Sequence, residues 1–194
     1  QRAGKAETMV KMGALLRLAA KLKADAVSEW IENFLAESDE KLVVFGVHRE
    51  MLKLIRDRCS CQSILIDGSV TGEHRRTAVK LFASKRYNRV LFGNLQAAGV
   101  GVDGLQVART VLMVEFGWTP GGVRQAEKRC HRIGTQDTVF STWLVARGTL
   151  EEKLCRVLQK KQETSDSILD GGGGEEKLNV YEQLLRELKK ENKS

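Results

Sequence analysis

Features that mark several common protein classes are missing from the 194-residue sequence. No apolar run approaches the roughly 20 residues that a membrane-spanning helix needs, and no signal-peptide pattern opens the chain. The three histidines are too dispersed for an obvious metal site, and Cys59 and Cys61 lack the spacing of a zinc knuckle. We therefore expect four reduced thiols, no metal, no membrane contact, and an intracellular location in the cytoplasm, nucleoid or nucleus.

Two elements that handle phosphates are also missing from the sequence. It holds no G-x-x-x-x-G-K-[ST] segment, whose backbone amides and lysine would cradle the phosphates of a nucleotide. It also holds no D-E-x-H or D-E-A-D segment that would bind magnesium. We therefore predict that this chain alone does not hydrolyse ATP. Its start at Gln1, without methionine, suggests an excised fragment.

Positive charge is in excess. The sequence has 32 Lys and Arg residues against 25 Asp and Glu residues, which gives a net charge of +7. Such an excess permits nucleic-acid binding, but a merely basic soluble protein would show the same balance. The hydrophobic content of 42% is ordinary, and the length suffices for one domain with appendages.

Short apolar runs alternate with helical patterns through the middle of the chain. The predicted strands cover residues 41–47, 63–66, 89–93, 110–116 and 138–145. Helices are predicted at 9–22, 24–37, 50–58, 71–83, 119–134 and 149–164. This alternation predicts an α/β fold, with a parallel sheet, right-handed crossovers and helices on both faces.

Other local patterns concern the core and the helix ends. Trp30, Phe34 and Trp143 are expected in the core, and Thr71 is expected to cap a helix. Thr149 to Glu152 forms a capping-box pattern. Beyond the glycine linker 171–174, a final helix carries an apolar stripe of Leu178, Tyr181, Leu185 and Leu188. The stripe favours docking on the chain's own domain, with a partner surface as the alternative.

The helix predicted at 119–134 carries the most informative pattern. Thr119 and Pro120 form a helix start, and Gly134 supplies the stop. Gln125, Arg129 and Arg132 are spaced at i, i+4 and i+7 and so share one face. Two guanidiniums and an amide on one face suit a polyanion, although a solvated basic face is the plainer interpretation of such a pattern.

The surrounding residues resemble a known family. The segment 116–134, with W-x-P followed by Q-A-E-x-R-x-H-R-I-G, resembles the last motif of superfamily II helicases. More narrowly, it is similar to the SWI/SNF-type DNA translocases and their annealing-helicase branch, although Thr135 stands where the family usually has Gln. The resemblance implies the second RecA-like lobe of a two-lobe motor.

The resemblance also implies roles in nucleotide chemistry. It places Arg129 and Arg132 as catalytic residues that reach the γ-phosphate of ATP on the other lobe, with Gln125 in support. The loop from Asn94 to Asp103 resembles the fifth motif of the family, which touches both nucleotide and DNA backbone. Its glycines allow close backbone approach, so the expected nucleotide contacts are Gly99, Gly101, Asp103 and Gln125. For Asp103 a turn or cap role is an equal alternative.

Four further residues are expected at the nucleic acid. The D-G-S turn ending at Ser69, followed by Arg75 on a helix, resembles a family pattern beside a helix N-terminus that suits a DNA phosphate. His48 ends a buried strand, where open α/β sheets place ligands, although a solvent-facing loop residue is the alternative. Asn94 stands where the family has a small hydroxyl residue.

These patterns divide the chain into an N-terminal helical segment, 1–40, a RecA-like lobe, 41–169, and a linker with a C-terminal helix, 170–194. The expected function is the second lobe of an ATP-dependent DNA translocase or helicase. Its expected partners are DNA, through backbone contacts, and a first RecA-like lobe of the same protein that binds ATP and Mg²⁺. The alternative is a non-catalytic module that binds nucleic acid or protein, and an RNA helicase lobe is a third, weaker interpretation.

Overall fold

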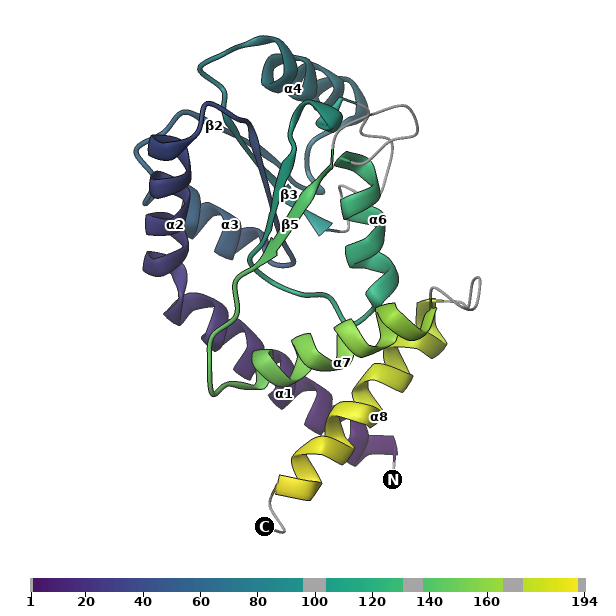
Figure 1. The fold of residues 1–194 in the computed structure, drawn as a ribbon. Helices are drawn as coiled ribbons and strands as arrows, with labels where there is room; N and C mark the ends of the chain where they lie inside the picture. Colours follow the sequence, from purple (N-terminus) through teal and green to yellow (C-terminus); the bar gives the residue numbers. More distant parts are fainter. Residues whose placement is uncertain (1, 96–103, 131–137, 166–172, 192–194) are drawn as a thin grey trace.

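The computed structural model describes residues 2–95, 104–130, 138–165 and 173–191 (Figure 1). Five parallel strands form its central sheet, in the order β2-β3-β1-β4-β5. The strands are β1 (Leu42–Gly46), β2 (Ser63–Ile66), β3 (Val90–Asn94), β4 (Thr110–Met113) and β5 (Phe140–Trp143). The parallel sheet confirms the α/β fold class that the sequence predicts.

Helices alternate with these strands, as the sequence pattern predicts. They are α1 (Arg2–Leu22), α2 (Ala24–Glu37), α3 (Arg49–Arg56), α4 (Gly72–Ser84), α6 (Pro120–Cys130), α7 (Leu150–Ser165) and α8 (Gly173–Glu191), with a 3₁₀ turn η1 (Leu105–Val107). Within the described ranges, no helix is both long enough and apolar enough to cross a membrane.

Helices cover both faces of the sheet. The central strand β1 is fully buried, as its continuous apolar run predicts. Because side chains alternate along a strand, Val43 and Phe45 join one core while Leu42 and Val44 join the other. Side chains of α4, α6, α7 and α8 fill the first core, and those of α2 and α3 fill the second. Figure 1 shows α2 and α3 on one side of the sheet and α6 on the other.

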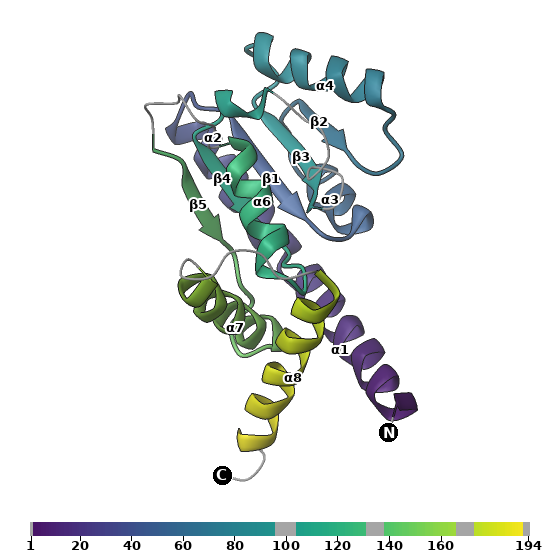
Figure 2. The ribbon, with the colours of Figure 1, turned by 90° about the vertical axis from the view of Figure 1, so that its right-hand side faces the viewer.

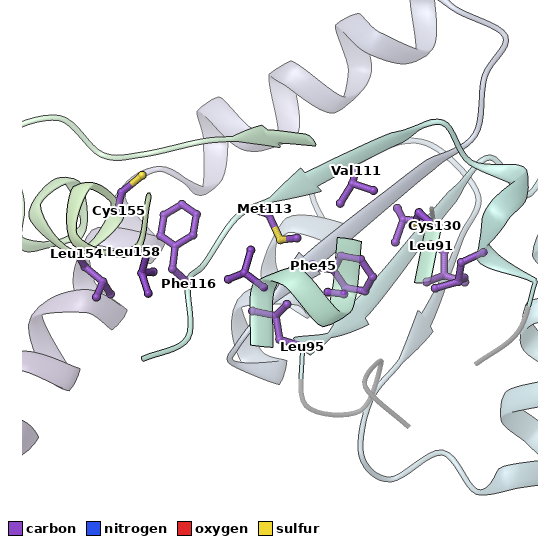
Figure 3. Close-up of a cluster of buried hydrophobic side chains, with 14 of the residues drawn as sticks. Phe45, Leu91, Leu95, Val111, Met113, Phe116, Cys130, Leu154, Cys155 and Leu158 are labelled. Atoms are coloured by element: carbon purple, nitrogen blue, oxygen red, sulfur yellow. The ribbon is translucent and has the colours of Figure 1, made fainter. Parts of the chain in front are cut away.

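The first core extends beyond the sheet toward α7. Figure 3 shows buried side chains running from Met113 through Phe116 to Leu154 and Leu158. Phe116 stacks on Trp143, with ring centroids 4.8 Å apart. Trp143 is only half-buried, so the prediction that it lies in the core is confirmed in part. Phe116 follows β4, and its packing fixes the direction in which the chain leaves the sheet.

Some predicted element bounds and one predicted cap need correction. The helix predicted at 9–22 begins at Arg2, and the strand predicted at 110–116 ends at Met113. The last strand ends at Trp143 rather than at 145, because its partner β4 has only four residues and the Leu144 carbonyl accepts a hydrogen bond from Lys23 instead. Thr71 precedes α4 in an extended conformation but makes no capping bond to the backbone; its hydroxyl contacts Nδ1 of His74 at 2.8 Å. The predicted capping box is present in part: the Thr149 hydroxyl accepts the Glu151 amide, while the Glu152 carboxylate accepts the amide of Gly148 rather than that of Thr149.

A buried ion pair joins the N-terminal helices to α7. Lys23 lies between α1 and α2, and its Nζ is 2.5 Å from Oε1 of Glu151 and 2.6 Å from the Leu144 carbonyl oxygen. The same ammonium lies 5.5 Å from the centre of the Phe116 ring. Burial lowers the pKa of Lys23 below its ordinary value, although the Glu151 carboxylate opposes that shift. One ammonium thus connects four segments of the fold.

The C-terminal helix α8 docks on its own domain, which confirms the favoured interpretation of its apolar stripe. Tyr181 is fully buried, together with Val180 and Leu184 on the same helix. Its ring meets the Trp118 ring edge-on, with centroids 6.5 Å apart. Because these side chains belong to the first core, α8 forms part of the packed domain.

Replacing Tyr181 with alanine should therefore destabilise the protein. Removing a fully buried aromatic ring costs about 3–5 kcal/mol, because the cavity does not close completely. Urea unfolding of Tyr181→Ala, compared with wild type, measures this loss. Tyr87→Ala is the matched control, since Tyr87 is 59% exposed and its removal should change stability by less than about 0.5 kcal/mol. Equal effects of the two variants would show that α8 does not contribute to the core.

Candidate site at the carboxyl edge of the sheet

Polar side chains follow three neighbouring strands where those strands end. His48 follows β1, Asn94 closes β3 and Glu115 follows β4. Asn94 pairs with Gly46 across the ladder, and its Nδ2 donates a hydrogen bond to the Val47 carbonyl at 2.5 Å. Because parallel strands end at the same edge, these residues form one row, and the sequence predicts this position for His48.

The centre of this row is the buried carboxylate of Glu115. Its Oε2 accepts the backbone N–H of Val47 at 3.0 Å and that of His48 at 2.8 Å. Its Oε1 lies 2.7 Å from Nδ1 of His48. Glu115 is only 4% exposed, so these bonds replace water around a carboxylate that would be costly to bury alone.

Helix α1 reaches the same row through Arg17. Its Nε donates a hydrogen bond to Nε2 of His48 at 3.0 Å. Arginine has no acceptor, so Nε2 must accept and the imidazole proton is assigned to Nδ1, where Glu115 accepts it. The side chains of Arg17, His48, Glu115 and Trp118 line a cavity of about 130 Å³ between α1, the sheet edge and α7.

The row continues beyond β2 through Asp67. Its Oδ2 lies 2.5 Å from Nε of Arg49, and its Oδ1 accepts the Ser69 amide at 2.9 Å and the Ser69 hydroxyl at 2.5 Å. Burial acts to raise the pKa of Asp67, but the two bonds from Ser69 and the charge of Arg49 outweigh it and hold the pKa below its ordinary value. Ser69 is thus positioned by a residue that the sequence pattern identified only as part of a turn.

Arg75 lies one turn into α4, beside this loop. The side chain is half-buried, and its Nη2 donates to the Val70 carbonyl at 3.1 Å. The guanidinium therefore fixes the segment that joins Ser69 to α4. All four residues predicted for nucleic-acid contact belong to the elements that end or begin at this edge.

Helix α6 carries the predicted catalytic face. Gln125 is exposed and Arg129 is half-buried, while Val123, Ala126 and Cys130 are buried as the spacing predicts. The opposite side of α6 is anchored: the Glu127 carboxylate accepts the Ser141 hydroxyl at 2.6 Å, and Arg124 donates to the Gln162 carbonyl at 3.3 Å. These contacts fix the rotation of the helix about its axis.

The structure separates the α6 face from the polar row. Helix α6 begins beside the carboxyl edge and crosses the sheet toward the other edge, as Figure 2 shows. Its 11 residues span about 16 Å at 1.5 Å per residue, and Arg129 is next to its last residue. Arg129, the described residue of the predicted catalytic pair, therefore lies away from the polar row, toward the other edge of the sheet. Four predicted site residues, Gly99, Gly101, Asp103 and Arg132, lie outside the described residues.

Sequence reasoning missed the residues that organise the row. A charged residue closing an apolar strand was a usable signal for Glu115, because such a side chain must find partners at the strand end. Arg17 and Arg49 gave no comparable signal, since each is one of many arginines on a helix. Their contacts with His48 and Asp67 join residues far apart in the chain.

Comparison with known proteins finds one matching family and several similar proteins. The family described as helicase conserved C-terminal domain matches residues 23–134. The DNA annealing helicase and endonuclease ZRANB3 of Mus musculus is 34% identical over 177 residues, which cover 88% of this chain and 16% of that protein. The SWI/SNF-related matrix-associated actin-dependent regulator of chromatin subfamily A-like protein 1 of Drosophila melanogaster is 31% identical over 152 residues, covering 77% of this chain and 20% of that protein.

Solved structures support the same fold. The C-terminal part of the Fun30 ATPase domain superimposes with a TM-score of 0.66 at 21% identity, covering 84% of this chain and 53% of that one. The Sulfolobus solfataricus SWI2/SNF2 ATPase core gives a TM-score of 0.58 at 24% identity, covering 74% of this chain and 29% of that one. These matches confirm the RecA-like architecture, and the relatives confirm the resemblance to SWI/SNF-type helicases.

The Asp67 contacts predict a pH-dependent contribution to stability. Since the pKa of Asp67 is depressed in the folded state, its contribution is present above about pH 4 and is lost as the pH falls through the folded pKa. Asp67→Asn should cost about 1–3 kcal/mol at pH 7, and the deficit should shrink below pH 4. Urea unfolding at several pH values measures both variants. Asp57→Asn, at an exposed carboxyl, is the control. A deficit independent of pH would contradict the assignment.

Proposed function

This chain belongs to the helicase conserved C-terminal domain family, and from that premise we propose that it is the second motor lobe of an ATP-dependent DNA translocase. The single observation that carries the proposal is the extent of the family match. Residues 23–134 include every residue predicted for DNA or nucleotide contact, from His48 to Arg132. The names of the relatives, which include a DNA annealing helicase, favour DNA over RNA as the partner.

The proposed partner lobe belongs to the same protein and supplies what this sequence lacks. The chain spans 16% of the mouse relative, whose name describes a DNA annealing helicase and endonuclease. Neither a phosphate-binding loop nor a D-E-x-H segment occurs in the 194 residues. Among the described residues, no three His, Cys, Asp or Glu side chains gather as ligands for a metal ion. The proposal therefore assigns ATP and Mg²⁺ mainly to the first lobe.

The α6 end of the lobe would serve the nucleotide. Arginine keeps its charge at all physiological pH values, and its planar fork matches phosphate oxygens. Gln125 and Arg129 share a face of α6, which the contacts of Glu127 and Arg124 hold in a fixed rotation. When the two lobes close, Arg129 and Arg132 would offset the charge that develops on the transferring phosphoryl group. ATP supplies the phosphoryl group, and this chain supplies the cations.

The carboxyl-edge row would hold the DNA backbone. Arg17, Arg49 and Arg75 present three guanidiniums along it, and phosphate prefers such donors. His48 accepts a hydrogen bond from Arg17 at Nε2, so its chief role would be to position that guanidinium. Contacts to phosphates carry no sequence information, so binding should be sequence-tolerant.

Ser69 and Asn94 would contribute less directly to DNA binding, because both side chains already make hydrogen bonds within the protein. The Ser69 hydroxyl donates its proton to Asp67, so it can donate to a phosphate only after turning away from that carboxylate. Asn94 uses its amide to hold the Val47 carbonyl at the end of β1. Both residues would therefore shape the edge at least as much as they contact DNA.

Assaying ATP hydrolysis by the full-length protein tests the proposed function directly. Hydrolysis stimulated by single-stranded, duplex or forked DNA is expected, and RNA should stimulate it less. If the full-length protein binds DNA but does not hydrolyse ATP, the proposed motor is wrong and a non-catalytic binding module is the better interpretation. If only RNA stimulates hydrolysis, the protein is an RNA helicase and not a DNA translocase.

Arg132→Ala in the full two-lobe protein should nearly abolish ATP hydrolysis while folding and DNA binding survive. Arginines that stabilise a phosphoryl transition state contribute about 10³ to 10⁵ in turnover, and lysine should not restore it fully. Turnover is measured per folded molecule, with the melting temperature recorded in parallel. Lys128→Ala removes one charge from an exposed position of α6 and is the control. Turnover near normal in Arg132→Ala would refute the assignment.

Arg75→Ala should weaken DNA binding and reduce its dependence on salt. Each lost phosphate contact lowers the slope of log K against log salt by about 0.7–0.9, because fewer counterions are released. Titration of labelled DNA at several salt concentrations gives the slope. Arg76→Ala is a matched control, since the neighbouring residue on α4 is exposed and carries the same charge. Equal slopes for the two variants would place the DNA away from Arg75.

A further inference from the structure

Helix α1 exposes apolar side chains that the proposed motor does not use. Among the described residues, eight large hydrophobic side chains are exposed, and four of them belong to α1: Val10, Leu15, Leu18 and Leu22, which are 73%, 54%, 53% and 73% exposed. The three leucines are spaced at i, i+3 and i+7, so they share one face of the helix, here called the leucine stripe. Single exposed leucines are ordinary, whereas a row on one helix face indicates an interaction surface.

A different face of α1 packs against the helix's own domain. Met12 and Ala19 are each only 3% exposed, and Ala20 is 1% exposed. Leu16 packs against the same core as Met12. Since these side chains already seat α1 on the domain, the leucine stripe is not needed for that contact. A helix that is apolar on two faces is typical of a helix buried between two bodies.

The leucine stripe belongs to the part of α1 that reaches the polar row. Arg17, which lies between two of the leucines in the sequence, donates its hydrogen bond to His48 at the end of β1. Figure 2 shows α1 extending beyond the sheet toward the N-terminus. The family match begins at residue 23, so α1 precedes the matched segment. The stripe therefore lies beside the edge to which the proposed motor assigns the DNA.

The charges on α1 indicate what kind of surface would cover the stripe. Lys11, Arg17 and Lys21 are exposed, whereas Glu7 is the one acidic residue of the helix and already pairs with Lys11 at 2.7 Å. Two copies of α1 packed through their stripes would bring two basic rims together, which disfavours a second copy of this chain. The complementary surface is an apolar helix face with an acidic rim.

We propose that the leucine stripe docks an apolar, acid-rimmed helix face on the first lobe of the same protein. The chain spans 16% and 20% of the mouse and Drosophila relatives, so most of a protein of that kind lies outside these residues. A lobe in the same polypeptide meets the stripe at high effective concentration, so a small apolar seam suffices where a separate partner needs a larger interface. The inference rests on the proposed two-lobe arrangement and adds the surface that joins the lobes.

Docking through the stripe would also act on the polar row. Helix α1 would then be held from two sides, by its own domain and by the first lobe. Because Arg17 contacts His48 from this helix, the position of the first lobe would bear on the guanidinium that the row presents to DNA.

Thiol labelling of the folded full-length protein tests the docking. Leu18→Cys reports on the stripe, and Val107→Cys, at an exposed apolar position of η1, is the matched control. A maleimide is added, and peptide mapping separates each introduced thiol from the four native cysteines. In the 194-residue chain both thiols should react at similar rates. In the full-length protein Leu18→Cys should react at least about tenfold more slowly than Val107→Cys, because the docked lobe must open first.

Two second-site variants in the Leu18→Cys background test the character of the contact. Leu15→Asp should restore fast labelling in the full-length protein, since an unpaired carboxylate is costly to bury in an apolar seam. Lys21→Glu should raise the labelling rate as well, because it would place like charge against an acidic rim. Both positions are exposed, so the same variants of the 194-residue chain should keep the wild-type circular dichroism spectrum and melting temperature.

Several outcomes would overturn the proposal. Equal labelling of the two thiols in the full-length protein would show that nothing covers the stripe. Protection of Leu18→Cys in the 194-residue chain that grows with protein concentration would show a second copy as the occupant. Protection that persists after deletion of the first lobe, or in Leu15→Asp, would place the cover elsewhere, and an unchanged rate in Lys21→Glu would refute the acidic rim.

ATP hydrolysis by the wild-type full-length protein separates this inference from the proposed function. Hydrolysis by a protein whose stripe is open to labelling would overturn the docking and leave the motor standing. A protected stripe in a protein that does not hydrolyse ATP would overturn the motor and leave the docking standing.

Discussion

The buried carboxylate of Glu115 is the constraint on which the carboxyl edge depends. The amides of Val47 and His48 lie just beyond β1, where the strand ladder ends. Buried amides without acceptors would cost about 1–3 kcal/mol each, and Glu115 satisfies both with one oxygen. Its second oxygen orients His48, and His48 in turn receives Arg17. One side chain at the end of β4 thereby fixes the end of β1 and connects it to α1.

The buried Lys23–Glu151 ion pair is a second constraint on the fold, and it acts through charge pairing between distant segments. Removing both charges from a buried pair is often neutral, whereas removing one partner costs about 3–5 kcal/mol. The pair is therefore better understood as specifying an arrangement than as adding stability. With the Leu144 carbonyl and the Phe116 ring, it sets how the α1–α2 junction meets α7 and the end of β5. Arg17 on α1 can meet His48 only because that junction is fixed.

Local and periodic features were predictable from the sequence, while contacts between distant segments were not. The apolar run of β1, the spacing of Val123, Ala126 and Cys130, and the docking of Tyr181 each follow from a repeat within one segment. Arg17 contacts His48 and Glu115 contacts Val47 only in the folded chain, and no local sequence pattern predicts these hydrogen bonds. Thr71 shows that a local pattern can also mislead, because the hydroxyl of this favourable cap residue contacts the His74 side chain instead of the helix backbone. The roles predicted for Arg129, Arg132 and the glycine loop stay predictions.

The separation between the polar row and the α6 face has a mechanical consequence for the proposed motor. Glu115 belongs to the row, and only the segment 116–119 separates it from the first residue of α6. Helix α6 is packed through Val123 and Ala126 and anchored to β5 and α7, so it should move as one rigid body. A force applied at its C-terminal end by phosphate contacts would then act on Phe116 and Trp118 as well. The chain thus contains a continuous, packed connection between the proposed nucleotide end and the proposed DNA edge, and its energetic coupling is measurable by combining Arg132→Ala with Arg75→Ala in a double-mutant cycle.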